Sequence, residues 1–86
     1  MSYEEKDFKK VLDEMITDLT KEFPDSVFSF EEVLKDFWGT RYYLIKDGVR
    51  QSASLSMDSI MEAYYYPNML IEYKAALKYE VNRENS

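Results

Sequence analysis

Apolar residues recur at steps of three and four through the first quarter of the chain. The series comprises Phe8, Val11, Leu12, Met15, Ile16, Leu19 and Phe23. Such spacing places side chains on one face of a helix, so the series predicts an amphipathic helix of about five turns. The segment Pro24-Asp25-Ser26 follows directly and is expected to end it.

A second helix is expected over residues 30–38. Ser29 and Glu32 have the spacing of a capping box, in which two side chains satisfy N–H groups that a helix start leaves unpaired. The apolar stripe that follows comprises Phe30, Val33, Leu34, Phe37 and Trp38. Gly39 then stands where a helix end readily adopts a left-handed conformation, so the helix is predicted to stop there.

Residues 40–46 and 49–56 are predicted to form a β-hairpin. The first segment is rich in aromatic and β-branched residues, which favour strands. Asp47-Gly48, between the two segments, is a strong signal for a tight turn. The second segment alternates, with Val49, Ala53 and Leu55 on one side and Arg50, Ser52 and Ser54 on the other.

Two registers of this hairpin fit the sequence equally well. A two-residue loop directs Tyr42 and Leu44 to the core. A three-residue loop with a bulge at Gly48 directs Tyr43 and Ile45 there instead. The polar side of the second strand points outward in both registers.

Two further helices are expected after the hairpin. The first keeps helical spacing at Met57, Ile60, Met61, Tyr64 and Tyr65. Ser56 or Asp58 would cap its start, and Pro67 would end it because proline lacks an N–H and clashes with the preceding turn. Asn68 can cap the second helix, whose stripe comprises Leu70, Tyr73, Leu77 and Val81. Residues 83–86 are expected to fray.

These segments together predict one α+β domain over residues 1–86, in the order helix, helix, hairpin, helix, helix. The length of 86 residues suits a single domain. A two-stranded antiparallel sheet is not stable by itself, so its apolar face is expected to pack on the helices.

Composition removes much of the chemistry that a small domain can perform. The chain contains no histidine and no cysteine, which excludes imidazole bases, thiolate nucleophiles, Cys/His zinc sites and disulfides. No glycine-rich phosphate loop is present. We therefore expect no enzyme activity and no metal or cofactor. The chain has neither a signal-peptide pattern nor an apolar run of ~20 residues, so we expect a cytoplasmic protein without a membrane partner.

The net charge of −6 is concentrated in the first half of the chain. Residues 1–37 carry 11 acidic and 5 basic side chains, which sum to −6, whereas residues 38–86 carry 6 of each. One flank of the first predicted helix carries Asp7, Glu14, Asp18 and Glu22. Such a strip suits a basic groove on a larger protein and would repel nucleic-acid phosphates. A solvated flank that only aids solubility is the alternative interpretation.

Tyrosine is unusually frequent, with eight in the chain. Tyr64 and Tyr73 lie on apolar stripes and are expected in the core. Tyr66 is expected to be exposed, and one of Tyr42 and Tyr43 must face out of the hairpin. Exposed tyrosine offers a large contact area with little rotamer entropy to lose, so it favours a binding role. We therefore take Tyr43 and Tyr66 as candidate anchors for a partner.

The leading hypothesis is a small acidic protein-interaction module that acts as a stoichiometric inhibitor. Its acidic flank would steer it onto a basic groove of a larger protein, such as a nucleic-acid-handling enzyme. In size and composition the chain resembles the small acidic proteins with which bacteriophages block host enzymes or defence systems, among them anti-CRISPR proteins and DNA mimics. The resemblance implies competitive inhibition and rests on no particular motif.

Two alternatives stay open. Arg41, Lys46 and Arg50 lie in or beside the hairpin with an exposed tyrosine, a combination that can bind nucleic acid. The patch is small, so direct nucleic-acid binding is not the first expectation. A structural homodimer without an inhibitory role is the other alternative.

Overall fold

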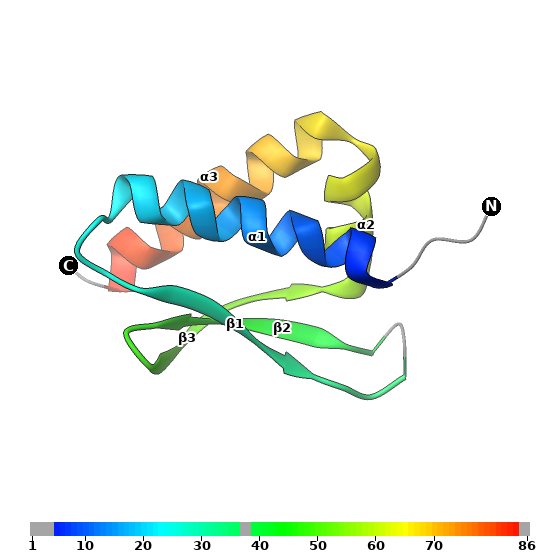
Figure 1. Cartoon of the computed structure of the whole chain (residues 1–86), viewed down its shortest axis with the longest axis horizontal. Coiled ribbons are helices and arrows are strands. Elements are labelled where there is room, and N and C mark those ends of the chain that lie inside the picture. The colour runs from blue at the N-terminus through cyan, green and yellow to red at the C-terminus, as the bar shows by residue number, and fades with distance from the viewer. Residues whose placement is uncertain (1–4, 37–38, 85–86) are drawn as a thin grey trace.

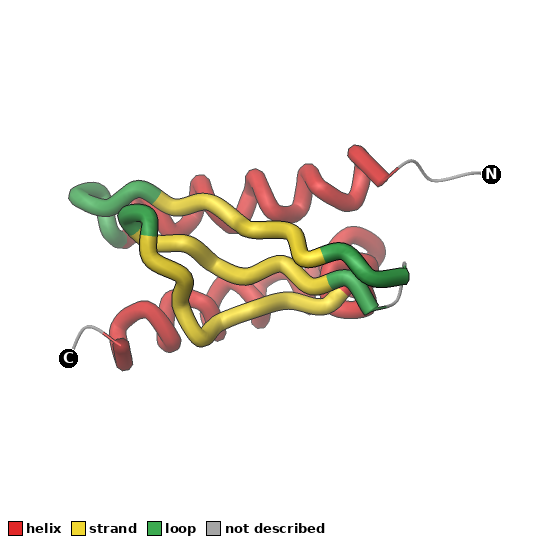
Figure 2. Tube along the Cα trace, turned by 90° about the horizontal axis from the view of Figure 1, so that it is seen from below, coloured by secondary structure: helices red, strands yellow, loops and turns green. Residues whose placement is uncertain are grey.

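Three helices lie on one face of a three-stranded sheet in the computed structural model, which describes residues 5–36 and 39–84 and their side chains from Phe8 onward. The elements are α1 (Glu5–Glu22), β1 (Phe28–Val33), β2 (Arg41–Lys46), β3 (Val49–Ser56), α2 (Met57–Tyr65) and α3 (Pro67–Glu84). The sheet is antiparallel in the order β1-β2-β3. Figure 2 shows its other face with no helix in front of it. The α+β class predicted from the sequence is confirmed.

The first helix forms as its periodicity predicts. The apolar series of α1 faces the sheet, where Phe8, Val11, Leu12, Met15 and Leu19 are buried. Ile16 and Phe23 pack on the edge of this core. The helix ends at Glu22, two residues before Pro24.

The predicted second helix is wrong, because its first part is strand β1. All six residues of β1 pair with β2, from Phe28 opposite Lys46 to Val33 opposite Arg41. The segment alternates, with Phe28 buried towards the helices and Glu31 exposed on the open face. The sheet therefore has three strands rather than two. Phe37 and Trp38, which the helix prediction included, lie outside the described residues.

The two-residue register of the hairpin is the one that forms. Lys46 pairs with Val49, and Tyr42 and Leu44 are buried. The turn needs positive φ at both central residues, Asp47 (52°) and Gly48 (81°), as a type I′ hairpin requires. A bulge interrupts β3. Tyr43 pairs with Ser54 and Ile45 pairs with Arg50, so a single β2 residue, Leu44, lies opposite residues 51–53 of β3. The predicted inward side of β3 holds for Ala53 and Leu55, whereas Val49 at the hairpin end is 63% exposed.

A sharp junction joins α2 to α3. Ser56 caps α2, since its side chain accepts a hydrogen bond from the Ser59 N–H. Pro67 does not merely end α2; it is the first residue of α3, a position where its missing N–H is harmless. The predicted cap at Asn68 is therefore wrong, and the Tyr66 carbonyl accepts the first hydrogen bonds of α3. Helix α3 continues through Arg83 to Glu84, and residues 85–86 lie outside the described part.

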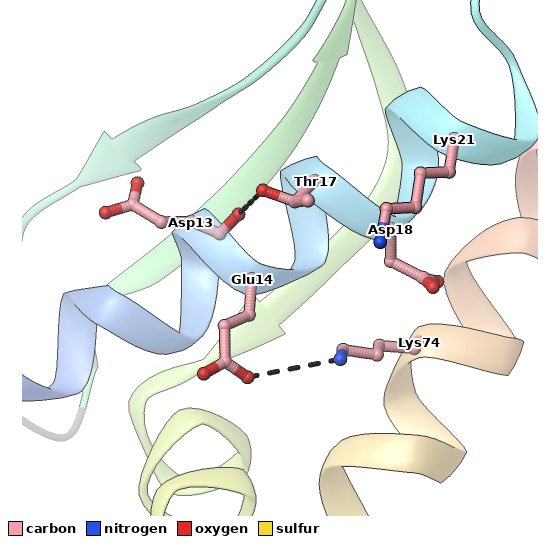
Figure 3. Close-up of a pocket in the computed structure, with 6 residues that line it drawn as sticks. All are labelled: Asp13, Glu14, Thr17, Asp18, Lys21 and Lys74. Atoms are coloured by element: carbon pink, nitrogen blue, oxygen red, sulfur yellow. Dashed lines mark hydrogen bonds and ion pairs between the residues drawn. The ribbon is translucent and has the colours of Figure 1, made fainter.

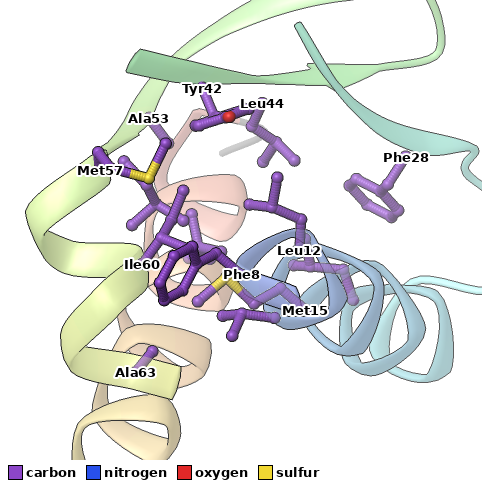
Figure 4. Close-up of a cluster of buried hydrophobic side chains, with 14 of the residues drawn as sticks. Phe8, Leu12, Met15, Phe28, Tyr42, Leu44, Ala53, Met57, Ile60 and Ala63 are labelled. Carbon is purple, nitrogen blue, oxygen red and sulfur yellow. The ribbon is translucent and has the colours of Figure 1, made fainter. Parts of the chain in front are cut away.

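The core lies between the helices and the inner face of the sheet (Figure 4). Met15 of α1, Leu44 of β2 and Ile60 of α2 meet there and are almost fully buried. Leu77 and Val81 anchor α3 to the same cluster. Each element therefore contributes at least one buried apolar side chain, and the opposite faces of helices and sheet remain available to partners.

Candidate interaction surfaces

The predicted acidic flank of α1 faces lysines of α3. Glu14 Oε2 lies 4.0 Å from Lys74 Nζ, and Asp18 Oδ2 lies 3.2 Å from Lys78 Nζ. Glu14 and Asp18 are four residues apart in α1, and Lys74 and Lys78 are four residues apart in α3. The two helices therefore run in the same direction, and each ion pair joins one turn of α1 to the corresponding turn of α3. Figure 3 shows Glu14 reaching across to Lys74.

The carboxylates of this flank and the lysines of α3 therefore form a ladder of two ion pairs, and the flank presents charges of both signs. The shallow hollow over it is lined by Asp13, Glu14, Thr17, Asp18, Lys21 and Lys74. Three carboxylates and two ammonium groups give it a formal charge of −1. Glu22 is exposed at the end of α1, and no ion pair joins it to another described residue. Asp7 belongs to α1, but its side chain is outside the described ones.

Tyr43 lies on the open face of the sheet, in the layer opposite the helices. The Arg50 guanidinium carbon lies 4.2 Å above the Tyr43 ring centroid. The same guanidinium pairs with the carboxylate of Glu31. Arg41 donates to Ser54 Oγ at 2.9 Å. Two arginines and one glutamate give these residues a net charge of +1.

The three basic residues of the hairpin do not share one surface. Side chains alternate along β2, so Lys46 points to the helix side while Arg41 points to the open face. Lys46 Nζ also lies 3.6 Å from Asp47 Oδ2. Only Arg41 and Arg50 are therefore available together, and Arg50 is already paired.

Tyr66 stands at the junction of α2 and α3, far along the chain from the acidic flank. It is 61% exposed, as the sequence predicts. Tyr64 and Tyr65 precede it and are partly exposed, with ring centroids 5.2 Å apart and edges towards faces. Tyr64 packs in the same way on Phe8 of α1, also at 5.2 Å. Tyr64 thus borders the core rather than filling it.

Two carboxylates that the sequence did not indicate as site residues share an exposed face of α2 with Tyr65. Asp58 and Glu62 are exposed on α2, one turn apart, and neither forms an ion pair with a described residue. Tyr65 follows at seven residues from Asp58 and continues the same exposed face. We refer to Asp58, Glu62, Tyr65 and Tyr66 as the α2 corner. Their four-residue spacing is visible in the sequence, which predicts only a possible helix cap at Asp58.

Three carboxylates have a lowered pKa because they accept hydrogen bonds that hold parts of the fold together. A hydrogen bond from Tyr42 holds the pKa of Glu32 below its usual value, with help from Lys9. The Val27 N–H does the same for the pKa of Asp47, and Ser52 lowers the pKa of Glu84. Each group joins two elements or closes a turn, so these shifts do not indicate a catalytic centre. Within residues 5–36 and 39–84, no group of three potential ligands is placed to hold a metal ion.

The comparisons with known proteins give no functional information about the chain. The chain matches no protein-family model, and no curated protein or solved structure is significantly similar to it. None of the described helices has the length and apolar character that crossing a membrane requires.

Proposed function

We propose that the chain is a small acidic protein-interaction module that binds a larger protein stoichiometrically by occupying a basic surface. The α2 corner is the observation that supports this best. It joins exposed tyrosine rings to carboxylates that no described residue neutralises. Neither of the surfaces favoured from the sequence combines these two properties, because the α1 flank faces lysines and Tyr43 lies beneath Arg50.

The chemistry of the corner suits arginine and lysine side chains of a partner. A cation can approach the face of a tyrosine, an interaction of about 0.5–1 kcal/mol at exposed sites. The same cation can form a charge-assisted hydrogen bond with Glu62, which lies three residues before Tyr65 on the same face of α2. Asp58 lies about 10 Å from Tyr65 along the helix and adds negative charge for a second cation. Packing of Tyr64 on Phe8 and Tyr65 restricts the neighbouring rings before a partner binds, which lowers the entropy lost on binding.

The remaining negative charge acts at longer range. Net charge of −6 steers the molecule towards a basic surface and raises the association rate at low salt. Glu14 and Asp18 contribute to this field, although lysines of α3 lie against them. If the occupied surface of the partner normally binds nucleic acid, the protein is a competitive inhibitor, as its composition-level resemblance to phage inhibitors implies.

The nucleic-acid alternative receives less support from the geometry. Phosphate binding needs several unpaired cations on one surface. Arg50 is paired with Glu31, and Lys46 points to the other side of the sheet. The open face of the sheet therefore offers only Arg41 without an acidic partner among the described residues.

The test is affinity capture from a lysate of the native source with tagged full-length protein, with and without nuclease. We expect one dominant protein that survives nuclease and is lost with Glu62→Lys and with Tyr66→Ala. Asp25→Lys is the matched control, because Asp25 is an exposed carboxylate away from α2 and the charge change is the same. Equal capture by Glu62→Lys and wild type would overturn the α2 corner as the binding surface. Loss of capture on nuclease treatment would favour nucleic acid instead.

A further inference from the structure

The outer edge of β1 carries backbone groups that no described residue pairs with. The Asp47 N–H donates to the Val27 carbonyl at 2.8 Å, and this pair continues the register of β1 and β2 by one residue. Hydrogen-bonded residues alternate along an antiparallel pair of strands, so Ser29 and Glu31 also bond to β2. The intervening residues of β1 turn their N–H and C=O groups away from the sheet. They are Phe28, Phe30 and Glu32.

The opposite edge of the sheet, along β3, is protected. The Ser52 N–H donates to the Glu84 carboxylate of α3 at 3.0 Å. A bulge interrupts the strand between Arg50 and Ser54, and β3 runs directly into α2 at Met57. Bulges, charged groups and covering helices are the usual means by which proteins prevent a further strand from adding to a sheet. β1 instead keeps an unbroken register over its six residues, so a further strand can pair with it.

A hollow of about 340 Å³ lies between α1 and β1, beside this edge. Figure 2 shows α1 along the β1 side of the sheet and α3 along the β3 side. Phe30 and Glu32 line the hollow, so solvent reaches the part of the edge that they form. Phe28 is only 5% exposed, so the accessible edge begins after it. Phe30 and Glu32 together offer two N–H and two C=O groups to an incoming strand.

The side chains around the hollow set the chemistry that an incoming strand must have. The apolar part of the lining comprises Leu12, Ile16 and Phe30. Glu32 also lines the hollow, but its carboxylate already pairs with Lys9 at 3.3 Å. Asp13 is exposed in the same lining, and no ion pair joins it to another described residue. The hollow therefore suits an apolar side chain with a lysine or arginine close to it.

We propose that the β1 edge binds an extended peptide segment of another protein, which adds to the sheet as a fourth strand. The outward N–H and C=O groups of Phe30 and Glu32 form the main-chain hydrogen bonds of this addition. Side chains alternate along a strand, so the peptide residue opposite Phe30 points into the hollow. That residue is apolar. A lysine or arginine two positions away points to the same side and pairs with Asp13.

Charge favours a strand of another protein over a second copy of β1. Each copy of the chain has a net charge of −6 and an Asp13 carboxylate that no described cation neutralises. Pairing of two β1 edges would bring these like charges together. A segment with lysine or arginine is attracted to the same edge. The inference is independent of the α2 corner, because the two surfaces share no residue.

Amide hydrogen exchange of the free protein, followed residue by residue by NMR, tests the edge. The Phe30 and Glu32 amides should exchange faster than those of Ser29 and Glu31, which bond to β2. Equal protection of all four amides would overturn the proposal. Protection of Phe30 and Glu32 that increases with protein concentration would identify a second copy as the occupant and would also overturn it.

A display library of random seven-residue peptides, selected against the full chain, supplies the probe. We expect the selected peptides to carry an apolar residue and a lysine or arginine two positions apart, and to protect the Phe30 and Glu32 amides when bound. N-methylation of the peptide nitrogens that face β1 should abolish binding, whereas N-methylation of the intervening nitrogens should not. Equal loss from both methylation patterns, or recovery of no binding peptide, would overturn strand addition.

Charge reversal in the hollow tests the side-chain part of the proposal. Asp13→Lys should weaken binding of the selected peptides by about tenfold, because an attraction becomes a repulsion. Asp58→Lys is the matched control, since it makes the same charge change at an exposed position of α2 and should bind like wild type. Thermal unfolding of both variants checks that the fold is intact. Weaker binding by Asp58→Lys but not by Asp13→Lys would assign the peptides to the α2 corner and overturn this inference alone.

Discussion

Tyr42 donates a hydrogen bond to Glu32 Oε2 at 2.5 Å, and the two residues are register partners in β2 and β1. Lys9 of α1 adds an ion pair to the same oxygen at 3.3 Å. One carboxylate therefore joins a helix to two strands. The Tyr42 hydroxyl is the largest cause of the lowered pKa of Glu32.

The first prediction follows from this bond. Because the folded pKa of Glu32 lies below its unfolded value, the stabilisation is complete above the unfolded pKa of about 4.3 and is lost as pH falls through the folded pKa. Tyr42→Phe should lower the free energy of unfolding by about 1 kcal/mol at pH 7 and by less below pH 4. Urea unfolding from pH 7 to pH 3 measures both.

Tyr43→Phe serves as the control for this prediction, because Tyr43 lies on the other face of the sheet. It should leave the pH dependence unchanged. A Tyr42→Phe effect of the same size at every pH would mean that the hydroxyl acts independently of the charge on Glu32.

The strand β1 explains where reasoning from sequence fails. Phe30, Val33 and Leu34 satisfy helical spacing, and Ser29 with Glu32 resembles a capping box. In the structure, Ser29 instead pairs with Ile45 and Glu32 accepts from Tyr42. The free edge of β2 gives this segment a full set of backbone partners, and that tertiary gain outweighs a local helical preference. Residues 28–31 do alternate between apolar and polar side chains, but this alternation is short and contains no information about β2 as a partner.

The second prediction compares two leucines that differ in burial. Leu44 is fully buried in β2, whereas Leu34, which the helix prediction assigned to the apolar stripe, is 66% exposed. Leu44→Ala should reduce stability by about 2–5 kcal/mol, because it removes packing and leaves a cavity. Leu34→Ala should change stability by less than about 0.5 kcal/mol. Chemical unfolding at neutral pH compares them, and similar losses from both would contradict the placement of β1.

The candidate site was predictable only in part, because single residues were identified but their grouping was not. Exposure of Tyr66 followed from the triple tyrosine before Pro67. Glu14 and Asp18 lie on one flank of α1, yet the lysines that they face, Lys74 and Lys78, come from a helix 60 residues further along the chain. Charge counted along the sequence cannot reveal neutralisation between distant elements. Because ion pairing depends on these long-range contacts, the sequence does not distinguish Asp58 and Glu62 from the paired carboxylates of α1.

The ladder between α1 and α3 gives the third prediction. Asp18→Lys removes an ion pair of about 0.2–1 kcal/mol and adds repulsion of similar size against Lys78. Glu14→Lys should have a smaller effect, because Glu14 is more exposed and its pair is longer, at 4.0 Å. The double exchange Asp18→Lys with Lys78→Glu should recover most of the loss. A double-mutant cycle of unfolding free energies at low salt measures the coupling, and additive effects would show that the two groups do not interact.

The hairpin turn supports the last prediction, which isolates backbone conformation from packing. Gly48 has φ of 81°, and a Cβ added there would meet no atom within 4 Å. Gly48→Ala should therefore lower stability by about 1–2 kcal/mol through left-handed strain alone. Gly48→Asn should lose less, because asparagine tolerates positive φ. The free energies of unfolding of the three proteins test this order. Equal losses for alanine and asparagine would point to a side-chain contact at the turn, and no loss for either would contradict the type I′ geometry that sets the register of β2 and β3.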